Sequence, residues 1–498
     1  MRGGMLILAC MWVCHVVWAG AVGDTFNGGA GEPLTTFSLP DTSTLLAHIE
    51  VPVPPGSWAS HGYVSCVVMT PQGTLYVCDS YHGILYQYTN ANAADPSLPV
   101  VYGDPVCITP SETTTEYQPG FPDEVTLNGE GLLAASAPYW DDVGAVFLFD
   151  VSGPVPVQVD TIMGTGNSHT GMQVCADGGT LAFDDFEGMY MYSIYDRTGD
   201  IDPALEGFYL PPDGYRHWPG DVQMTSTKIV LSGRMEGGVT CLDVLDRATG
   251  LYIDGARLCG DGEDRFADTY VVIEGEGEEL LVVGSPWATV GGVSRAGTVD
   301  VFRWDEAALS YERVTAITSE TPTDNEQFGL NVQYDIRASV LAVGQTVERD
   351  SGMSSGDVAL FGCTIPDLLG GACAALGTIV PDQAMSSVQY GAVGGGQLGL
   401  GLVERDEAEG EYVTSVYVFE VEYDGLGPSP TPDPNVTPVT PEAPDTPTPT
   451  WLIGLGVVGV LILAGAVYWV WVSTLRHKHR YSTLTQAVPV DSPPITGP

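Results

Sequence analysis

Lysine is almost absent from this chain of 498 residues, in which Lys228 and Lys478 are the only two. The chain has 17 basic residues against 63 acidic ones, so its formal net charge is −46. Nucleic acids are bound through patches of Lys and Arg, and phosphate-binding loops of the Walker type need a lysine. The composition therefore excludes nucleic acid as a partner. It favours a surface kept soluble by carboxylates, or alternatively a cationic partner or bound Ca²⁺.

Motifs for zinc binding and catalysis are also missing or misplaced. No Cys-x₂-Cys or His-x₃-His spacing occurs outside the C-terminal tail. Gly352–Gly356 fits the Gly-x-Ser-x-Gly elbow, but it lies in a loop between predicted strands, not in a strand-to-helix turn. We therefore predict no catalytic residue, no metal ligand and no cofactor, and we expect that the protein is not an enzyme.

The two ends of the chain carry its only long apolar runs. Residues 1–21 contain Arg2, an apolar run from Met5 to Trp18 and then Ala19-Gly20-Ala21, which is typical of a cleaved signal peptide. A membrane span is the weaker interpretation, because about 20 apolar residues are needed to cross a bilayer. The first 21 residues are therefore excluded from the fold.

Residues 451–473 form an uncharged run that is long enough to span a membrane. Arg476, Lys478 and Arg480 follow at once, and basic residues beside a span stay in the cytoplasm. We therefore expect a single-pass protein of the plasma membrane, with its N-terminus outside and residues 474–498 as a cytoplasmic tail. A glycosylphosphatidylinositol anchor is the alternative, but such signals end in their apolar tail.

Residues 428–450 contain nine prolines and six threonines and offer no apolar set for a core. We interpret them as an extended stalk that carries O-linked glycans. Asn435 begins the only Asn-x-Ser/Thr sequon of the chain and is the predicted N-glycosylation site, although Pro438 weakens it. Residues 22–427, with 59 acidic and 13 basic residues, remain as the functional domain.

This domain is built from repeats. Short runs of apolar and small residues recur seven times, and their second residues lie at positions 75, 133, 181, 229, 281, 341 and 398. A loop and then a strand that nearly always opens on glycine follow each run, as in GAVFLF from Gly144 and GTVDVF from Gly297. Another predicted strand precedes each run. Each unit of roughly 54 residues thus contains at least three short strands with period-two patterning.

Seven such units predict an all-β fold, a seven-bladed β-propeller. The run LLAASAP and its equivalents are expected to lie nearest the axis, where only small side chains leave room, and the next strand is expected to hold residues such as Phe147 and Phe302. A strand near Leu46–Val53 is predicted to close the ring, because closure removes an exposed sheet edge.

Two stretches carry a family resemblance. The segment from Phe266 to Trp304 and the segment from Phe328 to Phe361 resemble FG-GAP repeats, which form the propeller of integrin α-subunits and of many extracellular proteins. The resemblance covers units two, five, six and seven, whereas the first unit is closer to an NHL-type blade. It implies architecture more strongly than function.

Some blades of the FG-GAP family bind calcium through a loop of the Asp-x-Asp-x-Asp-Gly type. The sequence of this chain does not match that loop. The equivalent loops are Asp335–Arg337, Asn128–Glu130 and Glu274–Glu278, of which only the last alternates carboxylates. Because Ca²⁺ needs six to eight oxygen ligands, a plain hairpin turn is the favoured interpretation and a calcium site the alternative.

Eight cysteines lie in the functional domain, and an even number in an oxidising compartment predicts disulfides. Cys66 and Cys78 lie on adjacent predicted strands, Cys241 and Cys259 are symmetric about Gly250, and Cys363 and Cys373 close one loop. Elimination then leaves Cys107 with Cys175 as the least certain pair.

The sequence therefore favours a cell-surface receptor or adhesion protein whose propeller binds an extracellular protein ligand without catalysis. Loops such as Tyr139–Asp142 place aromatics beside carboxylates, which suits a cationic partner bound in a salt-dependent way. Tyr481 and Leu484 fit a Tyr-x-x-Φ sorting signal, which is read by clathrin adaptors. A passive coat protein is one alternative. A surface-anchored propeller hydrolase of the sialidase type is another, but it would need an arginine cluster in its central funnel and Ser-x-Asp-x-Gly boxes, and no such box occurs.

Overall fold

The computed structural model describes residues 37–40, 43–52, 64–70, 73–92, 100–111, 120–164, 170–185, 188–195, 201–212, 214–217, 221–262, 264–348, 354–381, 387–394, 396–405 and 412–421. The chain divides into two compact units, Met1–Gly427 and Pro428–Pro498. The predicted signal peptide, stalk, Asn435, span and tail with Tyr481 and Leu484 lie outside the described residues. Among the helices that are described, none combines the length and the apolar character of a membrane span.

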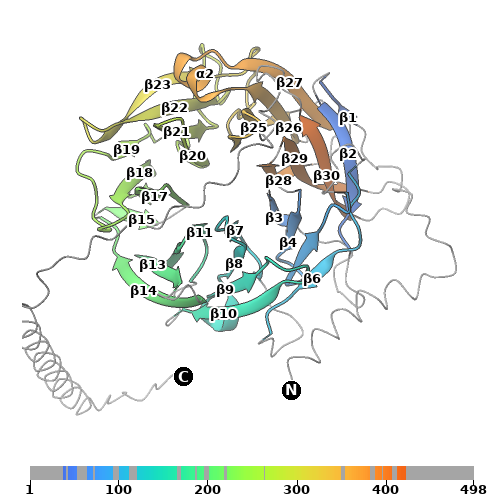
Figure 1. Ribbon diagram of the computed structural model, residues 1–498. Coiled ribbons are helices and arrows are strands. Elements are labelled where there is room, and N and C mark those ends of the chain that lie inside the picture. Colours follow the sequence, from blue (N-terminus) through green and yellow to red (C-terminus); the bar gives the residue numbers. More distant parts are fainter. Residues whose placement is uncertain are drawn as a thin grey trace, which may run out of the picture. The chain divides into compact units, whose positions relative to one another are not determined.

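Seven antiparallel sheets make up the described part of the first unit, and Figure 1 shows them arranged around a ring. The seven-bladed propeller is therefore confirmed. Blades one to three are consecutive four-stranded sheets, here given from the axis outwards. Their strands are β3 (Val64–Met69), β4 (Leu75–Asp79), β5 (Ile84–Tyr88) and β6 (Val106–Ile108); β7 (Val125–Leu127), β8 (Leu132–Ala137), β9 (Ala145–Asp150) and β10 (Val157–Met163); and β11 (Val174–Asp177), β12 (Thr180–Asp185), β13 (Gly188–Tyr195) and β14 (Ile201–Tyr209).

Blades four to seven continue around the ring, and in blade four two short strands share the innermost position. Their strands are β15 (Tyr215–His217) and β16 (Val222–Met224), β17 (Lys228–Met235), β18 (Thr240–Asp246) and β19 (Leu258–Cys259); β20 (Tyr270–Gly275), β21 (Glu278–Ser285), β22 (Thr298–Asp305) and β23 (Ser310–Ile317); β24 (Asn331–Asp335), β25 (Val340–Glu348), β26 (Ser354–Gly362), β27 (Ala374–Pro381) and β1 (Phe37–Ser38); and β28 (Ser387–Gly394), β29 (Gln397–Arg405), β30 (Tyr412–Val421) and β2 (Ser43–Glu50). Two helical turns, η1 (Trp140–Asp142) and α2 (Ile365–Gly370), lie between strands.

The ring is closed by strand β2, which comes from the N-terminal end of the domain. It pairs antiparallel with β30 of the last blade, with Ser43 opposite Val421 and Glu50 opposite Ser415. The predicted closing strand is confirmed, although it begins three residues earlier than the Leu46 proposed from the sequence. Innermost strands of neighbouring blades contact each other all the way round, including β28 with β3.

The small-residue runs are second from the axis and not nearest to it, so this part of the sequence interpretation was wrong. Their small side chains make room for the neighbouring blade. A Cβ atom on Gly284 of β21 would lie 2.1 Å from the carbonyl oxygen of Gly329, which leads into blade six. Gly297 lies just before the third strand of blade five and has φ of 82°. A Cβ atom there would lie 2.1 Å from the carbonyl oxygen of Phe328, in the same segment that leads into blade six. Close contact between neighbouring blades therefore explains why both positions are glycine.

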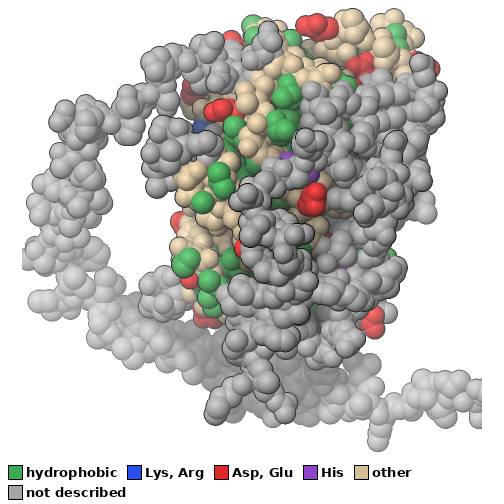
Figure 2. Space-filling model, turned by 90° about the vertical axis from the view of Figure 1, so that its right-hand side faces the viewer, with side chains coloured by type: hydrophobic (Ala, Val, Ile, Leu, Met, Phe, Trp, Pro, Cys, Tyr) green, Lys and Arg blue, Asp and Glu red, His purple; other side chains and the backbone are tan. Residues whose placement is uncertain are grey.

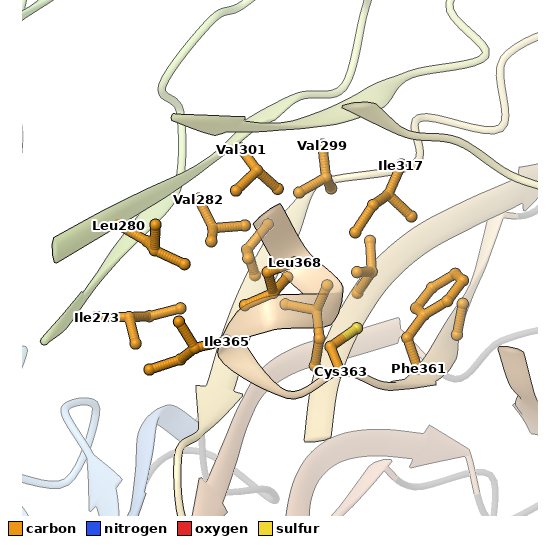
Figure 3. Packing of buried hydrophobic residues seen from close by; sticks show 14 of the residues in the cluster. Ile273, Leu280, Val282, Val299, Val301, Ile317, Phe361, Cys363, Ile365 and Leu368 are labelled. Atoms are coloured by element: carbon orange, nitrogen blue, oxygen red, sulfur yellow. The ribbon is translucent and has the colours of Figure 1, made fainter. Parts of the chain in front are cut away.

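Hydrophobic packing lies between blades. The described buried apolar residues fall into seven clusters, one at each interface between neighbouring sheets. Figure 3 shows the interface of blades five and six, where Leu368 of α2 lies in the centre, among valines of blade five such as Val282 and Val299 and the Phe361 ring of blade six. Each blade therefore depends on its neighbours for burial, as expected for a repeat architecture.

Polar side chains protect the free edges of the innermost strands. The N–H of Val174 in β11 donates to Glu124 Oε2, which comes from the segment just before β7, at 2.9 Å, and the N–H of Ala176 donates to Thr126 Oγ1 at 3.2 Å. Thr269 Oγ1 accepts the N–H of Val332 in the next blade in the same manner. A side chain of one blade thus accepts hydrogen bonds from backbone N–H groups at the edge strand of the next blade. Without it, these N–H groups would be unpaired.

Candidate functional site

A cavity of about 860 Å³ lies where blades four and five meet. It is lined by three arginines: Arg234 in β17, Arg265 in the loop from β19 to β20, and Arg295 in the loop from β21 to β22. Ligand cavities typically measure about 300–1,000 Å³. We call this cavity the arginine pocket, and its concentration of guanidinium groups is unusual in a domain with 59 acidic and 13 basic residues.

Trp287 organises the arginine pocket. The guanidinium carbon of Arg295 lies 4.6 Å from the ring centroid of Trp287, and that of Arg265 lies 5.0 Å from it. Cation–π contacts of this kind contribute about 0.5–1 kcal/mol at exposed sites. Trp287 Nε1 is buried and has no hydrogen-bond acceptor among the described residues. The ring therefore holds two cations.

The loops that carry these arginines are fixed by backbone hydrogen bonds. Trp287 N–H donates to Asp264 O at 2.9 Å, and Gln327 N–H donates to Arg295 O at 2.9 Å. Arg265 and Arg295 have φ of 54° and 50°, in the left-handed region that residues other than glycine rarely adopt. Such conformations persist where the surroundings enforce them and cluster at functional sites.

Carboxylates share the arginine pocket. Asp268 forms an ion pair with Arg265, while Asp261 and Asp264 complete the acidic part of the lining. Burial raises the pKa of Asp268, and the ion pair with Arg265 opposes this shift only in part. Arg234 and Arg295 have no carboxylate oxygen within 4.0 Å among the described residues. Arg234 nevertheless lies near enough to Asp268 to lower its pKa, so the pocket contains guanidinium donors and carboxylate acceptors that act on each other.

The side of the propeller drawn in Figure 2 has the opposite character. On the side of the propeller drawn in Figure 2, acidic side chains are scattered among apolar and neutral ones, and hardly any basic side chain is in view. The loop Tyr139–Asp142, predicted to present two aromatics, does so only in part. Tyr139 is 50% exposed, but Trp140 is 4% exposed and packs against Phe147 at 4.7 Å. Trp140 belongs to the core because the turn η1 folds its ring inwards.

The three loops weighed as calcium sites are hairpin turns, as the sequence favoured. Glu276 and Gly277 form the two-residue turn between β20 and β21, with Gly275 paired to Glu278. Asn128 Oδ1 accepts the N–H groups of Glu130 and Leu132 in the β7–β8 turn. Asp335 Oδ1 accepts the Arg337 N–H, and its Oδ2 accepts the Gly396 N–H of the next blade. In the described ranges, no three His, Cys, Asp or Glu residues are grouped to hold a metal ion.

Three predicted disulfides are confirmed. Cys66–Cys78, Cys241–Cys259 and Cys363–Cys373 are bonded, with Cα atoms 5.0, 4.1 and 4.6 Å apart. Cys66 and Cys78 lie opposite each other in β3 and β4, and Cys241 and Cys259 do so in β18 and β19. Pairing of adjacent strands therefore brings these thiols together.

The predicted pair of Cys107 and Cys175 was wrong. Cys107 is disulfide-bonded, but Cys175 is a free thiol. Cys107 lies on β6, the outer strand of blade one, whereas Cys175 lies on β11, the innermost strand of blade three. Cys175 instead accepts the N–H of Met224 in the next blade, and burial raises its thiol pKa. It has the same edge-protecting role as Thr126 and Thr269.

We expect loss of the Cys241–Cys259 bond to lower the free energy of unfolding by roughly 2–3 kcal/mol in a variant with both residues changed to alanine. The bond closes a loop of 18 residues, for which chain entropy gives about 3 kcal/mol. Urea unfolding without reductant measures the change. Cys175→Ser, which keeps the acceptor, is the control and should unfold within about 1 kcal/mol of the wild type. Equal stability of the double variant and wild type would contradict the expectation.

The chain has no match among family models and none among curated protein sequences. Among solved structures, it is similar to a putative 6-phosphogluconolactonase from Bacteroides fragilis, at 12% identity and a TM-score of 0.41, over 72% of this chain and 94% of that one. It is also similar to Saccharomyces cerevisiae Sqt1, at 11% identity and a TM-score of 0.40, over 74% of this chain and 98% of that one. A third similar structure is the β-propeller domain of the Trilobed protease from Pyrococcus furiosus, at 12% identity and a TM-score of 0.35, over 61% of this chain and 82% of that one. Likeness at this level carries no argument about activity, and the fold rests on the strand pairing of the chain itself.

The arginine pocket itself was missed by sequence reasoning. Its arginines lie 31 and 30 residues apart along the chain, in three separate loops and strands, and no motif joins them. One signal was present, because eight of the 13 basic residues of positions 22–427 fall between Lys228 and Arg313. That concentration marks blades four and five.

Proposed function

We propose that the propeller is the ligand-binding domain of a non-catalytic cell-surface receptor or adhesion protein. The observation that carries the proposal is the arginine pocket, in which guanidinium groups are held in place by Trp287 on fixed loops. A preorganised set of donors and acceptors on a rigid scaffold is what specific recognition requires, because little ordering entropy is lost on binding. Attachment by residues 451–473, with the stalk 428–450 between membrane and propeller, remains part of the proposal and rests on the sequence.

Relatedness to FG-GAP propellers is a further part of this proposal. It is supported by a repeated aromatic contact in blades two, five and six. The phenylalanine that leads into each blade packs edge-on against a phenylalanine of its third strand, in the pairs Phe121–Phe147, Phe266–Phe302 and Phe328–Phe361, at 5.5, 6.2 and 6.1 Å. The same contact at the same place in three blades is a repeat feature of structure as well as of sequence.

Beads coated with the purified full-length chain should bind to cells that display the partner, and binding should weaken at least several-fold when salt rises from about 0.05 to 0.5 M. Charges at an interface rim steer association, and salt screens them over about 10 Å at 0.1 M. Arg295→Ala should reduce bead binding, while Arg337→Ala is the matched control. Arg337 is exposed in the β24–β25 turn and lies outside the arginine pocket. Salt-independent binding, or equal loss in both variants, would contradict the proposal.

A surface-anchored hydrolase is the second candidate function. The observation that favours it is Asp268, a carboxyl with a raised pKa that lies among arginines in one cavity, as a general acid would. A panel of glycosidase and esterase substrates distinguishes the candidates. Turnover that disappears in Asp268→Asn would replace the receptor proposal with the hydrolase.

A further inference from the structure

We infer that the arginine pocket binds a saccharide that carries a single anionic group, a carboxylate or a sulfate. The inference rests on the proposed binding function and names its ligand class. It follows from the way charges of both signs are distributed around the cavity.

The cationic part of the arginine pocket fits one oxyanion. The guanidinium carbon of Arg295 lies over the ring of Trp287, and the N–H groups of a guanidinium project in its own plane. Arg234 is exposed, and its guanidinium group lies beside Gly238 of the pocket lining. Neither arginine has an ion-pair partner among the described residues. A planar guanidinium fork matches the two oxygens of a carboxylate or a sulfate.

The remaining lining fits hydroxyl groups. Asp261 and Asp264 bring carboxylate oxygens, which act only as acceptors when ionised, and Thr240, Thr289 and Ser294 bring hydroxyl groups. A sugar ring offers several O–H groups, each of which both donates and accepts. Such a ligand satisfies acceptors and donors together.

The same carboxylates disfavour a polyanion. An acidic peptide or a highly sulfated chain would bring further negative charges close to Asp261, Asp264 and Asp268 and to a domain that is itself strongly acidic. One anionic group beside uncharged hydroxyls avoids this repulsion. The cavity volume of about 860 Å³ is within the range for small ligands and too small for a folded partner.

Calorimetry with the purified full-length chain tests the inference. The probes are methyl glucuronide and methyl galactoside 6-sulfate, with methyl glucoside and methyl galactoside as their neutral counterparts. We expect saturable binding of at least one anionic probe, and binding at least 10-fold weaker for its neutral counterpart. The two anionic arms distinguish a carboxylate from a sulfate as the recognised group.

Variants locate the binding in the arginine pocket. Arg295→Ala and Arg234→Ala should each weaken binding roughly 10–100-fold, because a hydrogen bond to a charged group contributes about 1.5–3 kcal/mol. Arg295→Lys should restore only part of it, since lysine keeps the charge and loses the fork. Arg337→Ala should bind as the wild type does, and thermal unfolding checks that each variant is folded.

Three results would overturn the inference: neither anionic probe binds, inorganic sulfate or a polyglutamate peptide binds as tightly as the sugars, or Arg337→Ala weakens binding as much as Arg295→Ala does. Its failure is distinguishable from failure of the proposed function. If the sugars do not bind but cell adhesion persists and depends on Arg295, only the ligand class is wrong. If adhesion is absent as well, the receptor proposal also fails.

Discussion

Lys228→Met is expected to lower the free energy of unfolding by about 3–5 kcal/mol. Lys228 lies in β17 of blade four, and its Nζ is 2.9 Å from Glu279 Oε2 in β21 of blade five, with side chains 6% and 10% exposed. The ring of Trp304 covers the ammonium group, with 4.3 Å between Nζ and the ring centroid. Removing one partner leaves a buried charge uncompensated, which is costlier than the net value of the pair.

Two further variants separate the buried charge from other effects. A second carboxylate oxygen, Glu306 Oε1, lies 4.0 Å from Lys228 Nζ, but the Glu306 side chain is 82% exposed. Glu306→Gln should therefore change the free energy of unfolding by less than about 1 kcal/mol. Combining Lys228→Met with Glu279→Gln removes both charges and should recover part of the loss. Urea unfolding at pH 7.5 measures all three. A loss below 1 kcal/mol in Lys228→Met would show that Glu279 is not effectively buried.

Much of the fold could be predicted because each blade repeats the same local pattern. The glycine that opens the third strand of nearly every blade and the alternating residues of the strands mark the blades in sequence, and the number seven follows from counting them. The disulfide of Cys241 and Cys259 could be predicted for a related reason. Partners in adjacent antiparallel strands lie at positions that are symmetric about the connection, as the observed pairing confirms.

Features that depend on contacts between blades could not be predicted. The small residues of the second strands were placed nearest the axis, whereas Gly284 is small because Gly329 of the next blade lies against it. Cys175 was paired by elimination, whereas it accepts a backbone N–H from blade four. The arginine pocket, too, exists only because Arg234 of one blade faces Arg265 and Arg295 of the loops beside it. Periodicity within a chain determines strands, but it holds no information on which side chains meet across an interface.

The buried carboxyls Asp221 and Glu124, which lie between blades, should make the protein more stable at pH 5 than at pH 7.5. Burial raises the pKa of Asp221, at the start of β16, to about 6 from 3.8, and it also raises the pKa of Glu124 well above its usual value. Asp184 and Asp123 lie near enough to Glu124 to raise its pKa further. Buried Cys175 and Tyr270 lie beside the same carboxyls, and their own pKa values are raised by burial and by these carboxylates.

The direction of the effect follows from proton binding. Between about pH 4 and 6 the folded protein keeps the proton on Asp221, whereas the unfolded chain has released it. The free energy of unfolding therefore falls as pH rises through this window, and above pH 6 the ionised carboxylate costs roughly 2–3 kcal/mol. About half of this loss has already occurred at pH 5, so the share of Asp221 between pH 5 and pH 7.5 is about 1–1.5 kcal/mol. Glu124 acts in the same direction, as does repulsion among the many surface carboxylates, so the whole difference should be at least about 1 kcal/mol.

Asp221→Asn tests the assignment, because an amide keeps an acceptor for the Val222 N–H and cannot ionise. We expect this variant to be more stable than the wild type at pH 7.5 and to lose most of the difference between pH 5 and pH 7.5. Asp150→Asn is the matched control. Asp150 is the last residue of β9 and is partly exposed, and hydrogen bonds from Ser152 lower its pKa, so its ionised form stabilises the fold. If urea unfolding shows the same pH dependence in Asp221→Asn as in the wild type, the carboxyls between blades two, three and four do not control stability, and repulsion across the acidic surface accounts for the whole effect.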